Sequence, residues 1–393
     1  MAASNAWPVS RRSRISLLAC ALAVTLLAAC GGSQTAKAPS SGGGSDGSGH
    51  GQTVSVADRG PVNVYAADRA GDLAAAVRAD PALVYVPNTL SNTVTIISQK
   101  TMKVVGQFAT GQEPQHVTPA WNLNRLYVDN DLGNSVTPVD PRTGKPGTPI
   151  PVEDPYNMYF TPDGRYAIVV AERMLRLDFR DPQTMHLAHS LSVPTCAGVD
   201  HMDFSADGRY AFASCEFAGR MIKIDLRTQS VVGTVVLGNG QTAPQDVKLS
   251  PDGKVLYTAD QISGGLWEID PVSFRVIGFL RTGSGAHGLY PSRDARLMYV
   301  SNRHSGTISV LSFATRQIIK TWVIPQPSSP DMGGVSADGS TLWLSGRYNS
   351  EVYAINTQTG KLRARIPVGD GPHGLCVWPQ PGRYSLGHTG IMR

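Results

Sequence analysis

The sequence QDVKLSPDGKVLYTAD at residues 245–260 decides the fold, because it joins a short apolar strand, a Ser-Pro-Asp-Gly turn and a second strand. Residues 200–215 (DHMDFSADGRYAFASC) and 156–171 (YNMYFTPDGRYAIVVA) repeat this pattern. Short alternating apolar runs separated by Gly, Pro, Asn and Asp are typical of strands. Gly tolerates a positive φ in the turn, and Asp hydrogen-bonds back onto the backbone. The repeated unit is therefore predicted to be a β-hairpin.

The hairpin recurs at a nearly constant spacing. Two further strands are predicted after each copy, as in GLWEIDP from Gly265 and RVIGFLR from Arg275. The first seven copies are 41 to 45 residues apart, which is the period of four-stranded propeller blades rather than of helical repeats. The predicted fold class is all-β, a β-propeller of four-stranded antiparallel blades. The second strands of the copies are centred on Tyr85, Tyr127, Ile168, Phe212, Tyr257, Tyr299, Trp343 and, more weakly, Leu386.

The two ends of the chain predict eight blades. HGLCV from His373 resembles another innermost strand, and RYSLGHTG from Arg383 aligns with a second strand. Near the start, QTVSVADRG (from Gln52) and PVNVYAADRAG (from Pro61) align with third and fourth strands, ahead of an innermost strand at residues 73–77. Pairing the N- and C-terminal strands would close an eighth blade and remove exposed sheet edges. A seven-bladed ring with irregular ends is the alternative.

Residues 1–29 are predicted to be a signal peptide. Arg11, Arg12 and Arg14 precede an apolar stretch, residues 15–29, that is too short for a comfortable membrane span. Its end, Leu-Ala-Ala-Cys-Gly at residues 27–31, resembles the lipobox of bacterial lipoproteins, in which the Cys is diacylated and becomes the first residue. Two acyl chains on Cys30 would give stable membrane attachment. An ordinary secretory signal that happens to contain Cys30 is the alternative.

Residues 30–51 are rich in Gly and Ser and predict a flexible tether, which leaves residues 52–393 as the propeller domain. The chain is thus expected to be exported and attached to the cell membrane by lipid, outside the cytoplasm. The formal net charge of +5 falls to +2 without residues 1–29, which contain three Arg and no acidic residue. This balance argues against nucleic acid as a partner. We expect a monomer.

Three Cys lie in the propeller domain. Cys196 precedes an innermost strand, and Cys215 ends the strand after it, so both fall on one face of the fourth unit. In an exported protein this placement permits a disulfide, and two unbonded Cys are the alternative. Cys376 is expected to be buried in an inner strand.

A ring of polar residues is predicted where the innermost strands begin. These strands line the central channel of a propeller, so equivalent positions on successive units point to one axis. In the first unit the equivalent position, near Ala74, is apolar. Four His and two Asp suit a metal, haem or acid–base site, although each could instead hydrogen-bond to the neighbouring blade. The polar positions are His116, Asn157, His201, Asp246, His287, Asp331 and His373.

The second strands end at the same side of the ring, and their loops carry Arg173, Arg220, Arg303 and Arg347. Guanidinium groups around a channel suit carboxylate or phosphate ligands. Arg303 and Arg347 are therefore predicted, together with the ring of polar residues, to bind an anionic small molecule.

LMYVSNRHSGTISVLSFATRQIIKTW from Leu297 and LVYVPNTLSNTVTIISQKTMKVVGQF from Leu83 resemble the YVTN-type β-propeller repeat of bacterial surface and periplasmic proteins. The resemblance covers nearly all of residues 52–393. The sequence is also similar to the eight-bladed haem-d1 propeller of nitrite reductases and their maturation relatives. In that family the functional His opens an inner strand ahead of an Ser-X-Asp-Gly turn, as His201 does here. The chain has no Cys-X-X-Cys-His motif, which excludes a covalent c-type haem.

The sequence favours a binding protein over an enzyme, because it contains no HExxH or P-loop motif. The predicted function is a membrane-tethered extracytoplasmic propeller whose His, Asp and Arg residues bind an anionic small ligand or an envelope protein partner. The alternative, implied by the resemblance, is an enzyme or maturation factor that depends on a haem-like tetrapyrrole or a divalent metal. Fold resemblance by itself does not assign either function.

Overall fold

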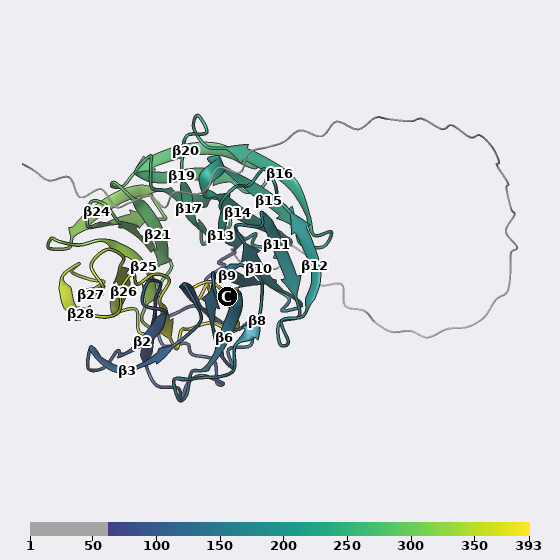
Figure 1. The fold of residues 1–393 in the computed structure, drawn as a ribbon. Helices are drawn as coiled ribbons and strands as arrows, with labels where there is room; N and C mark the ends of the chain where they lie inside the picture. The colour runs from purple at the N-terminus through teal and green to yellow at the C-terminus, as the bar shows by residue number, and fades with distance from the viewer. Residues whose placement is uncertain (1–61) are drawn as a thin grey trace, which may run out of the picture. The chain divides into compact units, whose positions relative to one another are not determined.

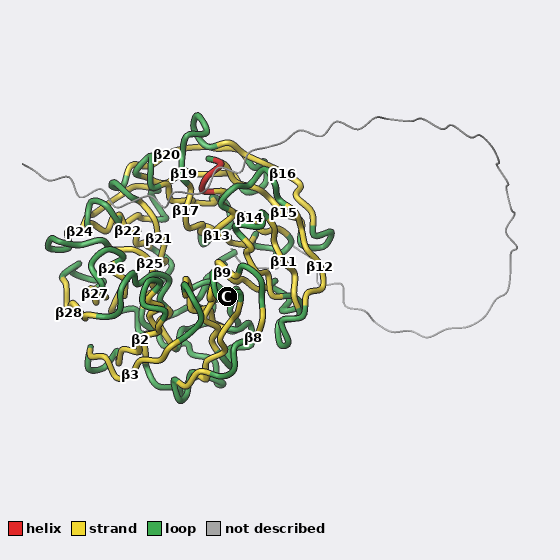
Figure 2. The backbone as a smooth tube through the Cα atoms, viewed as in Figure 1, coloured by secondary structure: helices red, strands yellow, loops and turns green. Residues whose placement is uncertain are grey.

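The structure, a computed structural model, describes residues 62–393, which form seven antiparallel sheets in a ring, six of four strands and one of five (Figure 1). We call the centre of the ring, which is lined by buried side chains, the channel. Apart from strands, loops and turns, the described residues contain a short 3₁₀ turn, η2 (Glu216–Ala218) (Figure 2). The innermost strands are almost wholly buried, whereas outer strands such as β3 alternate between exposed and half-buried residues. Successive sheets pack their apolar faces against one another around the ring.

The seven blades are numbered in chain order, and their strands are given from the channel outward. Blade 1 contains β29 (Cys376–Trp378), β1 (Leu83–Asn88), β2 (Thr93–Ser98) and β3 (Lys103–Ala109). Blade 2 contains β4 (Pro114–Pro119), β5 (Leu126–Asn130), β6 (Ser135–Asp140) and β7 (Lys145–Pro146), with β8 (Ile150–Pro151) also paired to β6. Blade 3 contains β9 (Pro155–Phe160), β10 (Ala167–Ala171), β11 (Arg176–Arg180) and β12 (Leu187–Ser192).

The remaining four blades follow the same order. Blade 4 contains β13 (Val199–Phe204), β14 (Tyr210–Cys215), β15 (Arg220–Asp225) and β16 (Ser230–Val236). Blade 5 contains β17 (Pro244–Leu249), β18 (Leu256–Asp260), β19 (Gly265–Asp270) and β20 (Arg275–Arg281). Blade 6 contains β21 (Ala286–Pro291), β22 (Leu297–Asn302), β23 (Thr307–Ser312) and β24 (Gln317–Val323). Blade 7 contains β25 (Pro330–Val335), β26 (Thr341–Gly346), β27 (Glu351–Asn356) and β28 (Leu362–Pro367).

The turn between β17 and β18 shows why the repeated hairpin forms. The Asp252 carboxylate accepts hydrogen bonds from the Ser250 hydroxyl (2.6 Å) and from the backbone N–H of Lys254 (3.1 Å). Ser250 Oγ also accepts the N–H of Val255, the residue just before β18 (2.9 Å). Gly253 lies at φ 72°, a conformation that favours glycine. The side chains of the turn therefore accept hydrogen bonds from backbone N–H groups that the strands leave unpaired where the chain reverses.

The prediction of eight blades is wrong: the ring has seven. One C-terminal strand, β29, pairs with β1 through Leu83 and Trp378, and so closes blade 1 with the three N-terminal strands. The segment from Pro61 that was predicted to be a strand forms turns over its described residues, and no strand forms at residues 73–77. RYSLGHTG, from Arg383, is likewise no strand. The ends do not add a blade because the C-terminal strand β29 serves as the innermost strand of blade 1.

The C-terminal segment, residues 379–393, instead folds into the channel. The end of the chain lies inside the ring beside β9 (Figure 1), and Leu386 exchanges backbone hydrogen bonds with Phe160 and Ile391. Gly387 has φ 98° and packs so closely on β9 that a Cβ atom would lie 2.5 Å from the carbonyl oxygen of Met158. Only glycine allows this approach. The turn places His388 fully inside the channel, where it is 1% exposed.

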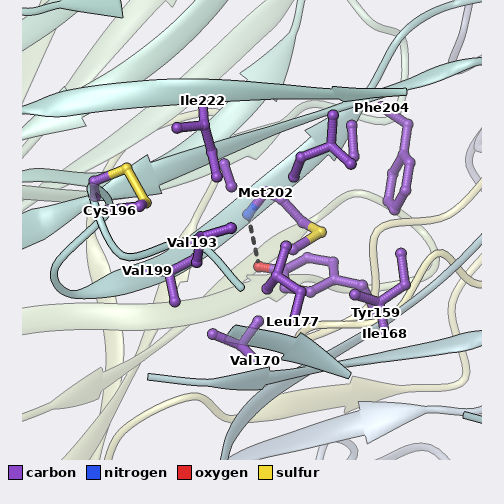
Figure 3. Packing of buried hydrophobic residues seen from close by; sticks show 14 of the residues in the cluster. Tyr159, Ile168, Val170, Leu177, Val193, Cys196, Val199, Met202, Phe204 and Ile222 are labelled. Atoms are coloured by element: carbon purple, nitrogen blue, oxygen red, sulfur yellow. Dashed lines mark hydrogen bonds between the residues drawn. A yellow bond between two sulfur atoms is a disulfide. The ribbon is translucent and has the colours of Figure 1, made fainter. Parts of the chain in front are cut away.

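Blades 3 and 4 pack through a cluster that includes Tyr159, Met202 and Phe204 (Figure 3). The Tyr159 hydroxyl accepts a hydrogen bond from the backbone N–H of Met202 (3.0 Å), so the contact also joins the two inner strands. Cys196 and Cys215 form a disulfide at the edge of this cluster. Cys376 is a free, buried thiol.

The signal peptide, the lipidated Cys30 and the tether lie outside the described residues and stay predictions. Within residues 62–393, no helix has the length and hydropathy needed to cross a membrane.

Candidate functional site

In four of the seven blades, the ring of polar residues coincides with a slip in strand pairing where the inner strand begins. In blades 4 to 7 two consecutive residues at this point have no partner on the second strand, which interrupts the regular alternation of side chains. His201, Asp246, His287 and Asp331 are among these unpaired residues. The register shifts lie between Val199 and Met202, Pro244 and Val247, Ala286 and Leu289, and Pro330 and Gly333.

The four predicted His converge in the channel. The ring centroids of His116 lie 5.7 Å from His201 and 4.9 Å from His373, and His287 lies 6.0 Å from both His201 and His373. His373 precedes β29 and so takes the position in blade 1 that the sequence assigned to Ala74. Every blade thus presents a polar residue here. Burial lowers the pKa of all four imidazoles well below the usual range, so they are neutral at pH 7.

His388, which sequence reasoning missed, is a fifth His in the channel. Its ring centroid lies 5.0 Å from that of His116 and 4.9 Å from that of His201. Asn157 connects it to the ring, because Asn157 Nδ2 lies 3.1 Å from His388 Nδ1 and 3.2 Å from His201 Nδ1. We call His116, His201 and His388 the histidine triad. A His after the last full repeat was the only sequence signal for it.

On the other side of the channel lies a second group, Arg303, Arg347, His287, Asp331 and His373, which we call the arginine cluster. Arg303 donates from Nε (2.9 Å) and Nη2 (2.7 Å) to Asp331 Oδ1, and His287 Nδ1 lies 3.1 Å from the same oxygen. Burial alone would lower the pKa of the Arg303 guanidinium. The attraction of the Asp331 carboxylate is larger than this effect, and the pKa is raised. The carboxylate is therefore already neutralised by an internal cation.

Arg347 carries the unbalanced charge of the arginine cluster. Its Nη1 donates to Thr89 Oγ1 (3.0 Å) and to the carbonyl oxygen of Gly371 (3.4 Å), both neutral groups. Within residues 62–393, no carboxylate lies within 4.0 Å of its guanidinium. Burial lowers the pKa of Arg347. The negative charge of Asp331 opposes this shift, and the positive charge of Arg303 adds to it. A half-buried guanidinium without a counterion suits an anionic ligand.

The cluster lies beneath the loops that follow the second strands, at an end of the channel that we call the mouth. Tyr348, next to Arg347, is 52% exposed, and its ring stacks on that of His304 at 6.5 Å. Arg303 Nη1 donates to the Tyr348 hydroxyl (3.4 Å). The C-terminal segment enters the channel from the opposite end, so the mouth is the side from which a ligand can approach the arginines.

Asp246 shares the ring position but has a structural role. Its Oδ1 accepts from Lys248 Nζ (2.8 Å), and its Oδ2 accepts from the backbone N–H of Leu289 in the next blade (2.9 Å). This hydrogen bond between blades is the structural role that the sequence analysis gave as the alternative to ligand binding.

Asp200 adds an acidic group beside the histidine triad. Its Oδ1 lies 3.1 Å from His201 Nε2, yet both carboxylate oxygens are buried and lack a hydrogen-bond partner among the described residues. Burial, together with the negative charges of Glu216 and Glu172, raises the pKa of Asp200 well above its usual range. The Asp200 carboxyl beside the triad therefore favours its neutral form, whereas the arginine cluster contains two guanidinium groups.

Arg173 and Arg220, the other arginines predicted near the mouth, make local contacts. Arg220 Nε donates to the carbonyl oxygen of Ala218 (3.2 Å). Arg173 forms ion pairs with Asp154 and with Asp131 (3.3 Å). Two carboxylates share this single guanidinium. Burial and the neighbouring Asp154 therefore raise the pKa of Asp131.

Asp131→Asn is expected to gain stability relative to the wild type as pH rises from 5 to 7. In this window the folded protein holds a proton on Asp131 that the unfolded chain has released, so rising pH costs the wild type up to about 1.4 kcal/mol per pH unit. The Asn variant has no such proton to lose. Urea unfolding at both pH values measures the difference. A stability difference that is constant or falls with pH would contradict the assignment.

The channel does not fit a haem-like tetrapyrrole between the imidazoles. The ring centroids of His116 and His373 are 4.9 Å apart, and those of His116 and His388 are 5.0 Å apart. A tetrapyrrole macrocycle is several times wider than an imidazole and cannot enter such spaces. No mechanism through haem follows from these residues.

Comparison with known proteins identifies similar chains. The YNCE-like beta-propeller family matches residues 55–381. A 6-phosphogluconolactonase of Serratia proteamaculans is 23% identical over 233 residues, which cover 53% of this chain and 70% of that protein.

Two solved structures share the fold. Kuenenia stuttgartiensis hydrazine synthase has a TM-score of 0.56 and 18% identity, covering 73% of this chain and 92% of that one. The dihydro-heme d1 dehydrogenase NirN has a TM-score of 0.58 and 16% identity, covering 77% of each chain. At these identities the likeness shows the propeller architecture alone.

Proposed function

The chain belongs to the YNCE-like β-propeller family, and from that premise we propose that it is a binding protein whose arginine cluster holds an anionic small molecule at the channel mouth. The observation that carries the proposal is Arg347, a half-buried cation that hydrogen-bonds only neutral oxygens. A carboxylate or phosphate would supply the missing counterion and accept charge-assisted hydrogen bonds.

The arrangement around Arg347 favours a small ligand over a broad protein surface. Arg303 is only 10% exposed and is held by Asp331, which leaves Arg347 as the guanidinium of the cluster that lacks an acidic partner among the described residues. His304 and Tyr348 offer ring faces beside the charged groups. Aromatic faces with a guanidinium suit a ligand that combines an anionic group with an apolar or sugar-like body.

A second candidate is an enzyme that hydrolyses a phosphorylated sugar lactone. It is motivated by the relative named 6-phosphogluconolactonase and by the neutral imidazoles beside the arginine cluster, which could act as bases. Acid release from such a lactone, followed by titration at constant pH, tests it. An unchanged spontaneous rate in the presence of protein favours the binding function.

The anion-binding proposal is tested by ligand-induced thermal stabilisation of the full chain in detergent. The probes are citrate, succinate, inorganic phosphate and 6-phosphogluconate. At least one is expected to raise the melting temperature, because a ligand bound to the folded state stabilises it. Arg347→Ala should weaken that binding at least about tenfold, the loss expected for hydrogen bonds to a charged group.

Arg296→Ala is the matched control. The Arg296 side chain is 85% exposed and lies just before β22, at the end of the blade opposite the mouth, so binding should be unchanged. The proposal fails if no probe stabilises the wild type, or if Arg347→Ala binds as the wild type does.

We propose further that Cys30 is diacylated and holds the propeller at a membrane. Cys30→Ser should then move the protein from the membrane fraction into a soluble or uncleaved form, because the acyl chains supply the attachment. Cell fractionation and immunoblotting measure this, with Cys20→Ser in the signal peptide as the control that stays in the membrane fraction. A cleaved Cys30→Ser protein that remains firmly membrane-bound would refute the lipid attachment.

A further inference from the structure

Three buried nitrogens in the histidine triad have no partner. His116, His201 and His388 are at most 1% exposed, and the Nε2 atom of each makes no hydrogen bond among the described residues. One ring nitrogen from each residue lies within 4.8 Å of the others. Buried polar atoms are almost always paired, because leaving one unpaired costs free energy. Three buried imidazoles that come this close and leave ring nitrogens without a hydrogen bond indicate a missing common partner.

The opposite ring nitrogens are already oriented by hydrogen bonds. His116 Nδ1 lies 2.9 Å from the carbonyl oxygen of Tyr156, so Nδ1–H donates and Nε2 keeps a free lone pair. The Asn157 amide faces both His201 Nδ1 and His388 Nδ1, and its Oδ1 lies 3.3 Å from the latter. The Met158 N–H donates to Asn157 Oδ1 (2.9 Å), so the amide nitrogen faces the two imidazoles and their Nδ1 atoms accept from it. Of the three histidines, His116 holds its other N–H as metal-binding histidines typically do.

The surroundings of the triad favour a cation. Asp200 has two buried carboxyl oxygens without a hydrogen bond among the described residues, and its Oδ1 lies 3.1 Å from His201 Nε2. By contrast, the similar group His287, Asp331 and His373 already contains the guanidinium of Arg303 bound to its carboxylate. Of the two groups, only the triad therefore has both imidazole nitrogens without a hydrogen bond and a carboxyl group that is not paired with a guanidinium.

We propose that His116, His201 and His388 bind a divalent transition metal of the Zn²⁺ class, with Asp200 next to them as a charge-balancing group or fourth ligand. Three imidazoles, alone or with a carboxylate, are a ligand set that zinc favours. Gly374 helps to position the site, since a Cβ atom there would overlap the His116 ring.

The metal would also tie the chain end to the ring. His116 and His201 come from the inner strands of blades 2 and 4, whereas His388 comes from the C-terminal segment. One ion would thus join three distant parts of the chain inside the channel. Because the unfolded chain cannot present this set, metal binding should raise the melting temperature of the wild type.

The test uses the full chain, purified in detergent and stripped with a chelator. Zn²⁺ content is measured by mass spectrometry after dialysis, and Co²⁺ is titrated while visible absorption is recorded. The wild type is expected to retain one metal ion per chain and to show the absorption of a nitrogen-ligated Co²⁺. His388→Ala should lower the affinity at least about tenfold, since even losing a group that only orients a ligand costs that much.

His116→Gln is a second variant, which keeps the tail intact in case His388→Ala disturbs folding, and it should show the same loss. His186→Ala removes an exposed imidazole just before β12, outside the channel, and is the control with unchanged affinity. The proposal is overturned if the wild type retains no metal, or if His388→Ala and His116→Gln bind it as tightly as the control.

Discussion

Trp378→Ala is expected to lower the free energy of unfolding by about 3–5 kcal/mol, the usual cost of removing a fully buried tryptophan. Trp378 is 0% exposed and lies in β29, the strand that closes blade 1. Its indole Nε1 also donates to Asp80 Oδ2 (3.0 Å). The substitution therefore leaves a cavity, removes a hydrogen bond and weakens the pairing that joins the two ends of the ring.

Urea unfolding of the wild type and variant measures this loss. Val272→Ala, at a side chain that is 85% exposed, should change the free energy by less than about 0.5 kcal/mol. Trp378→Phe should fall between the two, because it keeps most of the apolar volume. A cost below about 1 kcal/mol for Trp378→Ala would mean that the ring does not depend on β29 for closure.

Arg393→Ala is expected to cost about 3–5 kcal/mol, because it leaves a buried charge without its partner. Arg393 Nη2 donates to Asp203 Oδ1 (2.7 Å), and Asp203 is 0% exposed. The Arg393 guanidinium also lies 4.9 Å from the centre of the Tyr65 ring. The pair holds the last residue of the chain against blade 4 and so keeps the C-terminal segment inside the channel.

Arg393→Lys keeps a positive charge and separates the role of charge from that of side-chain shape. It should recover part of the stability but not the stacking on Tyr65. Urea unfolding and limited proteolysis of the C-terminal segment measure the two effects. Unchanged stability and unchanged proteolysis in Arg393→Ala would show that the segment is held by other contacts.

Local pattern was sufficient to predict the blades, because strands and turns depend on residues close in sequence. Residues 245–260 form the two strands and the tight turn that their pattern indicates, and the Asp252 and Ser250 hydrogen bonds explain why. The number of blades depends on which chain ends meet. RYSLGHTG carries the local pattern of a strand, but the pairing of β29 with β1 leaves no sheet for it to join.

The candidate site was predicted only in part, because some of its residues lie in the repeats and others do not. Repeat alignment brought His116, His201, His287 and His373 to one axis, since equivalent blade positions are related by the ring. It could not place His388, because the segment that contains it was assigned to the second strand of an eighth blade that does not form. Nor could it predict that Arg173 pairs with a carboxylate whereas Arg347 bonds only neutral groups, because these partners come from other parts of the chain.

The central claim is that Arg347 at the channel mouth binds an anion, and a crystal structure of the full chain with the most stabilising of the four probes tests it most directly. The account predicts density for a carboxylate or phosphate within hydrogen-bond distance of the Arg347 guanidinium, with Arg303 still bound to Asp331. Density for the probe elsewhere on the molecule, with Arg347 contacting only Thr89 and Gly371, would contradict it.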